Sequence, residues 1–153
     1  MNSASSIYWV LVADSGTARF IELQRSPPRI REAHTFTSAA LHKRSGDLTS
    51  DASGRSFHVQ GPTSHSKQQR SDAHELAEAE FSRFLAKKLE QTEKLNSFER
   101  LLIVTDPRTL GRLRPLLSKP VVARVADEWD VNLTGLSLPD LEKRLRDRLG
   151  WPG

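Results

Sequence analysis

The chain of 153 residues has 37% hydrophobic and 27% charged side chains, proportions typical of one globular domain. Cysteine is absent, which excludes disulfide scaffolds, thiol nucleophiles and metal centres held by thiolates. The formal net charge of +4 lies wholly in residues 1–70, because residues 71–153 hold equal numbers of acidic and basic side chains. Apolar runs are too short to cross a bilayer and no basic secretory start is present, so we expect a cytoplasmic protein without a membrane partner.

The first forty residues predict three strands. Residues 7–13 form a continuous apolar run rich in β-branched and aromatic side chains, which indicates a strand buried on both faces. Asp14-Ser-Gly16 has turn chemistry, and residues 17–23 alternate between apolar and polar, so the two segments predict a hairpin. A weaker third strand is expected at residues 30–37, after the Pro27-Pro28 break.

Residues 38–70 contain almost no apolar side chains to bury. A polar, basic loop of this length is uncommon inside a compact domain and is usually functional or disordered. The next residues predict the best helix of the chain, at 72–92. Ser71 and Asp72 can cap it, and Glu75 completes a capping box. Apolar side chains follow at helical spacing and are expected to form its buried face: Ala73, Ala77, Phe81, Phe84, Leu85 and Leu89.

The remaining elements alternate between strands and helices. A buried strand is expected at 101–105, a helix from the Asp106-Pro107 cap to about Leu117, a fifth strand at 121–126, and a last helix opened by Ser137. The predicted fold is α/β: a single domain over residues 1–153, with a mixed five-stranded sheet of three antiparallel strands and two parallel additions, and flanking helices. This is an RNase H-like element order; a flavodoxin-like order fits less well because no helices separate the first three strands.

Acidic residues offer one enzymatic interpretation. Asp14, an α-helical glutamate (Glu75, Glu78 or Glu80) and Asp106 lie where RNase H-type nucleases place carboxylates that hold two Mg²⁺ ions. Asp14, Glu75 and Asp106 are therefore the catalytic candidates. Each also has an ordinary structural role, in a turn, a capping box and an N-cap respectively.

Two further motifs have simpler explanations. Asp14-Ser-Gly-Thr17 matches a phosphate-binding turn of sugar-kinase folds, but those proteins need two lobes and a far longer chain. His58, His65 and His74 lie farther apart than the usual ligands of a structural zinc. We therefore expect no bound metal and no other cofactor.

The polar loop predicts a nucleic-acid contact. Its cations Lys43, Arg44, Arg55, Lys67 and Arg70 are interleaved with Ser, Thr and Gly, and such a segment can follow a phosphate backbone. Only Phe57 of the loop could stack on a base, so a sequence-independent contact with the ribosome or tRNA fits better than base readout.

Several segments together resemble a known family. These are residues 9–20 (Trp-Val-Leu-Val-Ala-Asp-Ser-Gly-Thr-Ala-Arg-Phe), 54–57, 81–89, 98–111 with Pro107-Arg108 and Leu110-Gly111, and 130–134 followed by Leu138-Pro139. In order and spacing they resemble the bacterial host attachment proteins, named as required for attachment to host cells. That family is similar to the middle domain of archaeal and eukaryotic peptide-release factors, which has an RNase H-like topology.

The resemblance implies a role in translation, but it does not imply a particular catalysed reaction. In release factors the loop before the central helix carries Gly-Gly-Gln, whereas the matching region here has Gln60-Gly61-Pro62 and Gln68-Gln69. No catalytic residue is carried over. We therefore expect a non-enzymatic binding protein that contacts the ribosome or tRNA. The alternatives are a metal-dependent nuclease or peptidyl-tRNA hydrolase, and a regulatory factor in cell attachment that binds a protein partner.

Overall fold

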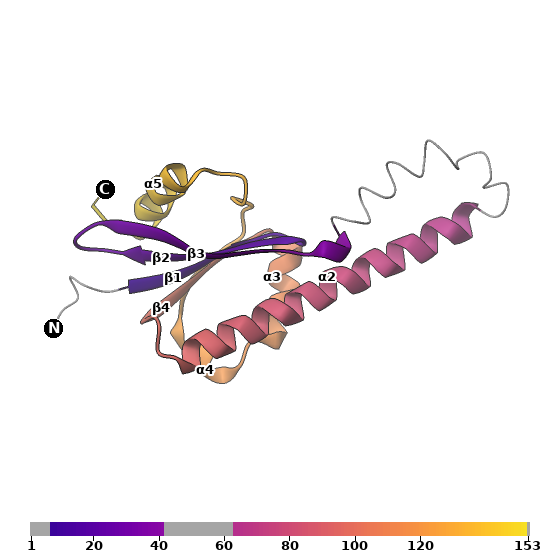
Figure 1. Cartoon of the computed structure of the whole chain (residues 1–153), viewed down its shortest axis with the longest axis horizontal. Helices are drawn as coiled ribbons and strands as arrows, with labels where there is room; N and C mark the ends of the chain where they lie inside the picture. The colour runs from indigo at the N-terminus through magenta and orange to yellow at the C-terminus, as the bar shows by residue number, and fades with distance from the viewer. Residues whose placement is uncertain (1–6, 42–62, 153) are drawn as a thin grey trace.

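The computed structural model describes residues 7–41 and 63–152, with side chains for all of these except 63–67. Five strands and several helical segments follow one another along this part of the chain, and residues 39–41 add a short helical stretch after the third strand (Figure 1). In chain order they are β1 (Ile7–Ala13), β2 (Thr17–Gln24), β3 (Arg29–Thr37), α2 (Thr63–Lys94), β4 (Arg100–Thr105), α3 (Pro107–Leu113), the 3-10 helix η3 (Arg114–Leu116), α4 (Lys119–Arg124), β5 (Val125–Trp129) and α5 (Leu138–Leu149). Within residues 7–41 and 63–152, none of the helices has both the length and the apolar character needed to span a membrane.

The five strands form one sheet in the order β3-β2-β1-β4-β5. The pairs β1–β2 and β2–β3 are antiparallel, while β1–β4 and β4–β5 are parallel. This confirms the predicted single α/β domain with a mixed, RNase H-like sheet. The central position of β1 explains its apolar sequence, because helices cover both faces of the sheet there.

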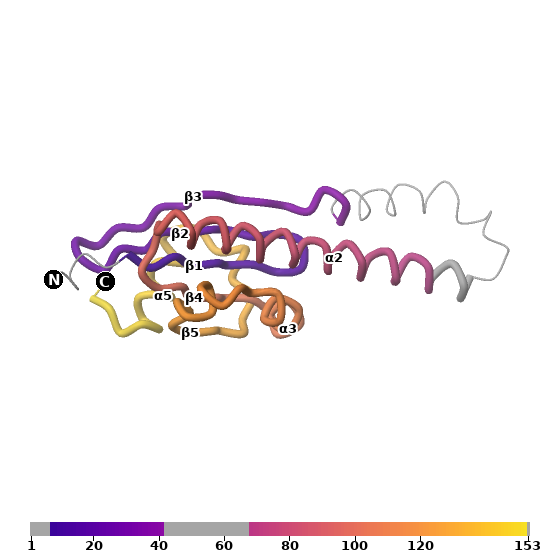
Figure 2. The backbone as a smooth tube through the Cα atoms, turned by 90° about the horizontal axis from the view of Figure 1, so that it is seen from below, coloured from indigo at the N-terminus to yellow at the C-terminus, as the bar shows by residue number. Residues whose placement is uncertain are grey.

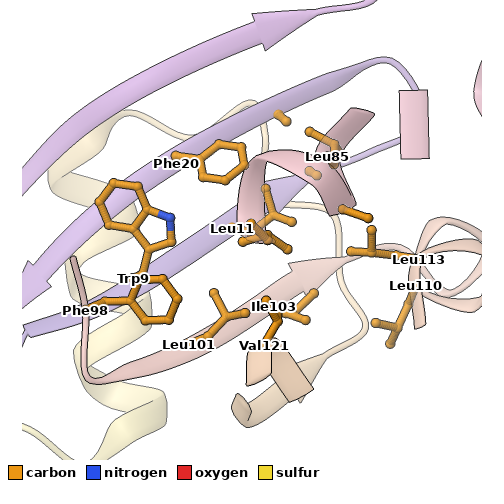
Figure 3. Close-up of a cluster of buried hydrophobic side chains, with 14 of the residues drawn as sticks. Trp9, Leu11, Phe20, Leu85, Phe98, Leu101, Ile103, Leu110, Leu113 and Val121 are labelled. Atoms are coloured by element: carbon orange, nitrogen blue, oxygen red, sulfur yellow. The ribbon is translucent and has the colours of Figure 1, made fainter. Parts of the chain in front are cut away.

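Helices α2, α3 and α4 lie on one face of the sheet and α5 lies on the other (Figure 1). The core on the α2 side includes Trp9, whose indole ring stacks on Phe98 at a centroid distance of 6.1 Å (Figure 3). The core on the α5 side joins Val10 and Val12 of β1 to Leu141 and Leu145 of α5. The sheet is therefore fixed from both sides, which holds the carboxyl ends of its strands in place.

The central helix begins earlier than predicted. α2 starts at Thr63, so residues 63–70 of the expected loop are helical, and Ser71 and Asp72 lie inside the helix instead of capping it. The capping-box role expected for Glu75 is therefore wrong. The first turns of α2 extend past the β1–β2 turn (Figures 1 and 2), where nothing requires apolar side chains, so hydrophobic periodicity could not reveal them. Residues 39–41 of the predicted loop are also helical, and residues 42–62 lie outside the described residues.

The segment before the fifth strand also differs from the expectation. Residues 119–124 form the helix α4, with Pro120 in its first turn and Val121 buried, and β5 begins only at Val125. A short apolar run does not distinguish a strand from a buried helical turn, which explains the wrong prediction of a strand at 121–126. Two predicted N-caps are confirmed: the Asp106 side chain accepts from the amide of Thr109, and Ser137 Oγ accepts from the amide of Asp140.

Candidate functional site

Asp14 closes the turn between β1 and β2. Its Oδ1 accepts hydrogen bonds from the amides of Gly16 at 3.0 Å and Thr17 at 2.8 Å, and its Oδ2 accepts from Thr134 Oγ1 at 3.0 Å. The two amides that a phosphate would need already donate to a carboxylate, which would also repel an anion. The geometry therefore favours an ordinary turn over a phosphate-binding one.

Asp14 and Asp106 lie side by side at the carboxyl edge of the sheet. Ala13 and Thr105 are partners in the parallel β1–β4 pair, and each aspartate follows directly. An open hollow of about 400 Å³ lies at this edge; Asp14, Gly16, Asp106 and Asn132 are among the residues that line it. Asp106 Oδ2 caps α3 at 3.1 Å from the Thr109 amide, whereas Oδ1 is buried and has no hydrogen-bond partner within the described residues.

The third expected carboxylate does not reach this hollow. Glu75 Oε2 lies 3.3 Å from Arg108 Nη2, on the side of α2 that faces α3. Glu78 is buried and contacts His74 at 3.2 Å and Arg112 at 3.2 Å, and Glu80 lines a separate groove beside Phe81. In the described ranges no three His, Cys, Asp or Glu side chains come close enough to hold a metal ion. The structure thus brings Asp14 and Asp106 together, but not the set that a two-metal nuclease would need.

A buried arginine that the sequence analysis missed supports this edge. Arg19 on β2 forms a bidentate pair with Glu32 of β3, with both N–O distances 2.8 Å. Its Nη1 donates to the carbonyl oxygens of Thr134 at 3.1 Å and Leu136 at 2.6 Å, and so fixes the loop that reaches Asp14. The hydrogen bond from Arg19, helped by one from Thr35, lowers the pKa of Glu32 although partial burial opposes this. Arginine in an otherwise apolar stretch of a strand was the available sequence signal.

The structure describes only a small part of the predicted cationic segment. Lys43, Arg44 and Arg55 lie outside the described residues, and Lys67 lies on α2 without a described side chain. Arg70 is exposed on the N-terminal part of α2. No hydrogen bond or ion pair of Arg70 is seen within the described part of the chain. Other arginines are paired with acids; these are Arg108, Arg112, Arg114, Arg124 and Arg148.

The histidines do not form a common site in the described part. His74 pairs with Glu78 on the next turn of α2, while His58 and the side chain of His65 are not described. Gln68 and Gln69 are exposed and helical, so they do not belong to a loop like the one that carries Gly-Gly-Gln in release factors.

The sheet order and the helix that follows β3 place the chain in the RNase H-like, release-factor-like class of α/β domains. The model of bacterial archaeo-eukaryotic release factor family 12 matches residues 8–145, and the chain belongs to that family. This confirms the release-factor-like part of the resemblance; the host attachment part stays a prediction.

The other comparisons add little. Solved structures that match include a chain of the "PilM-PilN type IV pilus biogenesis complex", with 18% sequence identity and a TM-score of 0.38. That match covers 92% of this chain and 42% of the other. A likeness this low carries no argument about function. No curated protein matches the chain.

Proposed function

We propose that this protein is a binding protein of the translation apparatus that contacts the ribosome or tRNA through Lys43, Arg44, Arg55, Lys67 and Arg70. The observation that carries the proposal is the match of a release-factor family to residues 8–145. Members of such a family are expected to meet RNA, and the five cations named here belong to the half of the sequence that carries the net positive charge.

The distribution of charge supports the same proposal. The whole net charge of +4 belongs to residues 1–70, and many arginines after residue 100 are neutralised by glutamate or aspartate. Cations release counterions when they meet phosphates, which makes binding independent of sequence and strongly dependent on salt. Arg70 adds a further argument, because it is exposed on the N-terminal part of α2 and has no ion pair within the described residues.

Co-sedimentation with ribosomes tests the proposal. The wild-type protein should pellet with ribosomes at low salt, and a variant with all five of these cations replaced by alanine should remain in the supernatant. A matched control removes the same charge from exposed cations on other parts of the molecule, and it should pellet like the wild type. The control replaces Arg29, Arg100, Lys119, Lys143 and Arg144 with alanine.

Three results would overturn the proposal. In the first, the wild type does not pellet at any salt concentration. In the second, the five-alanine variant pellets as well as the wild type and the control. A weakening that is equal in the variant and the control would mean that only net charge matters, and it would also remove the assignment to these five residues.

A further inference from the structure

A half-exposed aromatic cluster lies between β3 and α2. Phe84 was expected to belong to the buried face of the helix, but it is 38% exposed. Its ring meets Phe36 of β3 edge to face at a centroid distance of 5.0 Å and lies 6.1 Å from the ring of Phe81. The His34 ring stacks beside Phe36 at 6.0 Å. Aromatic surface is therefore left in contact with solvent beside the edge strand.

One cation contacts this aromatic surface, and two more are exposed on the same helix close to it in sequence. Lys88 Nζ lies 5.6 Å from the centre of the Phe84 ring and 5.7 Å from that of Phe36, a distance at which a cation is attracted to the ring. Arg83 and Lys87 are exposed on the same helix, one residue before and three after Phe84. Neither has an ion pair with an acid among residues 7–41 and 68–152, so their charges are not neutralised there.

The cluster also borders a groove. A hollow of about 260 Å³ runs between the end of β3 and α2, and Phe36, Phe81, Phe84 and Ala40 line it together with Glu80. Its wall is mainly apolar, and Glu80 is the one charged residue that lines it in the described part of the chain. The groove gives room for a flat group beside the Phe84 ring.

We propose that Phe36, Arg83, Phe84, Lys87 and Lys88 form a patch that binds a single-stranded RNA segment, in which a base stacks on Phe84 and phosphates lie near Arg83 and Lys87. This proposal rests on the proposed function and names a second contact surface for the same partner. Aromatic rings beside unpaired cations are the combination by which proteins hold single strands without reading their sequence. An apolar protein partner fits less well, because covering the patch would strip water from Arg83, Lys87 and Lys88, which pair with no acid in the described part of the chain.

Fluorescence anisotropy with a labelled short oligouridylate, and with a duplex RNA of the same length, tests this patch. Phe84→Leu keeps an apolar side chain against Phe36 but removes the ring, so it should raise the Kd for the single strand at least fivefold. Phe84→Tyr keeps the ring and should bind within about twofold of the wild type. Leu76→Ala is the matched control: Leu76 is 57% exposed on the same helix, and its loss should not change the Kd.

The cations are tested by salt titration of the same probe. Arg83→Ala/Lys87→Ala should weaken binding and reduce the slope of log K against log salt by roughly 1.4, since each lost phosphate contact on a single strand contributes about 0.7. The control Lys119→Ala/Lys143→Ala removes two exposed cations that lie elsewhere and should leave the slope unchanged. Circular dichroism of each variant establishes that it is folded.

The outcomes separate this proposal from the broader one. If the wild type pellets with ribosomes through the five cations of the proposed function, but Phe84→Leu and Arg83→Ala/Lys87→Ala bind oligouridylate unchanged, the patch is overturned and the proposed function stands. An equal effect of Phe84→Leu on single strand and duplex would overturn stacking. A self-association that Phe84→Leu abolishes, with RNA affinity unchanged, would identify the patch as an interface between copies and overturn the proposal. A wild type that binds neither ribosomes nor oligouridylate overturns both.

Discussion

Replacing Arg19 with methionine should destabilise the whole edge of the sheet that carries Asp14. The Arg19 side chain is 11% exposed, and it links three separate segments: β2, Glu32 of β3, and the loop at Thr134 and Leu136. Methionine has a similar length but no donors. The variant therefore leaves two carbonyl oxygens and one carboxylate without their charged partner.

The size of the loss follows from these contacts. Hydrogen bonds to a charged group contribute about 1.5–3 kcal/mol each, but they do not add, and breaking a buried ion pair costs about 3–5 kcal/mol. Glu32 is 27% exposed and regains some hydration, which places the expected loss near the lower end, at about 3 kcal/mol. For a domain of this size that corresponds to a fall in Tm of roughly 6–12 °C.

Urea unfolding followed by tryptophan fluorescence and circular dichroism measures this loss. The control is Arg31→Met, which breaks an ion pair with Glu22 on the same pair of strands, but whose arginine is 60% exposed. Exposed pairs contribute about 0–1 kcal/mol, so this variant should unfold close to the wild type. A loss below about 1 kcal/mol for Arg19→Met, or a loss equal to that of Arg31→Met, would refute the reasoning.

Three further predictions follow from the same structure. Because the folded-state pKa of Glu32 is lowered, the ionised Glu32 contributes stability above the ordinary glutamate pKa of about 4.3, and this stability is lost as the pH falls through the folded-state pKa. The difference in unfolding free energy between the wild type and Glu32→Gln should therefore shrink between pH 7 and pH 3. A difference that stays constant over this range would contradict the prediction. Arg146→Met removes a buried guanidinium that donates to the carbonyl of Gln24 at 2.6 Å, so it should cost about 3 kcal/mol in urea unfolding, against less than about 1 kcal/mol for the exposed Arg144→Met. Leu85→Ala opens a cavity between α2 and the sheet and should cost about 2–5 kcal/mol in thermal unfolding; a loss below 1 kcal/mol would mean that this core can collapse around the cavity.

The central strands, the hairpin and the last helix were predictable because their signals are local. β1 is apolar throughout because both its faces are covered. The side chains of Asp14, Asp106 and Ser137 each accept a hydrogen bond from a nearby backbone amide, as expected for turn and N-cap residues. The order of these elements then restricts the sheet topology to very few possibilities.

The extent of the central helix was not predictable in the same way. Hydrophobic periodicity reports only the part of α2 that lies against the sheet, so the polar turns from Thr63 onward gave no signal. The same limit applies to Phe84, whose position in the periodic pattern predicted burial, although it lies at the border of the buried face and stays 38% exposed.

The sequence by itself therefore determined which segments are buried and in what order, because hydrophobic spacing and capping act over a few residues. Only the tertiary structure decided which distant side chains meet. It joined Arg19 to the loop at Thr134, separated Glu75 from Asp14 and Asp106, and brought Phe36 to the edge of Phe84. Such contacts depend on the register of the strands and the rotation of α2 about its axis, and no local pattern in the chain encodes either one.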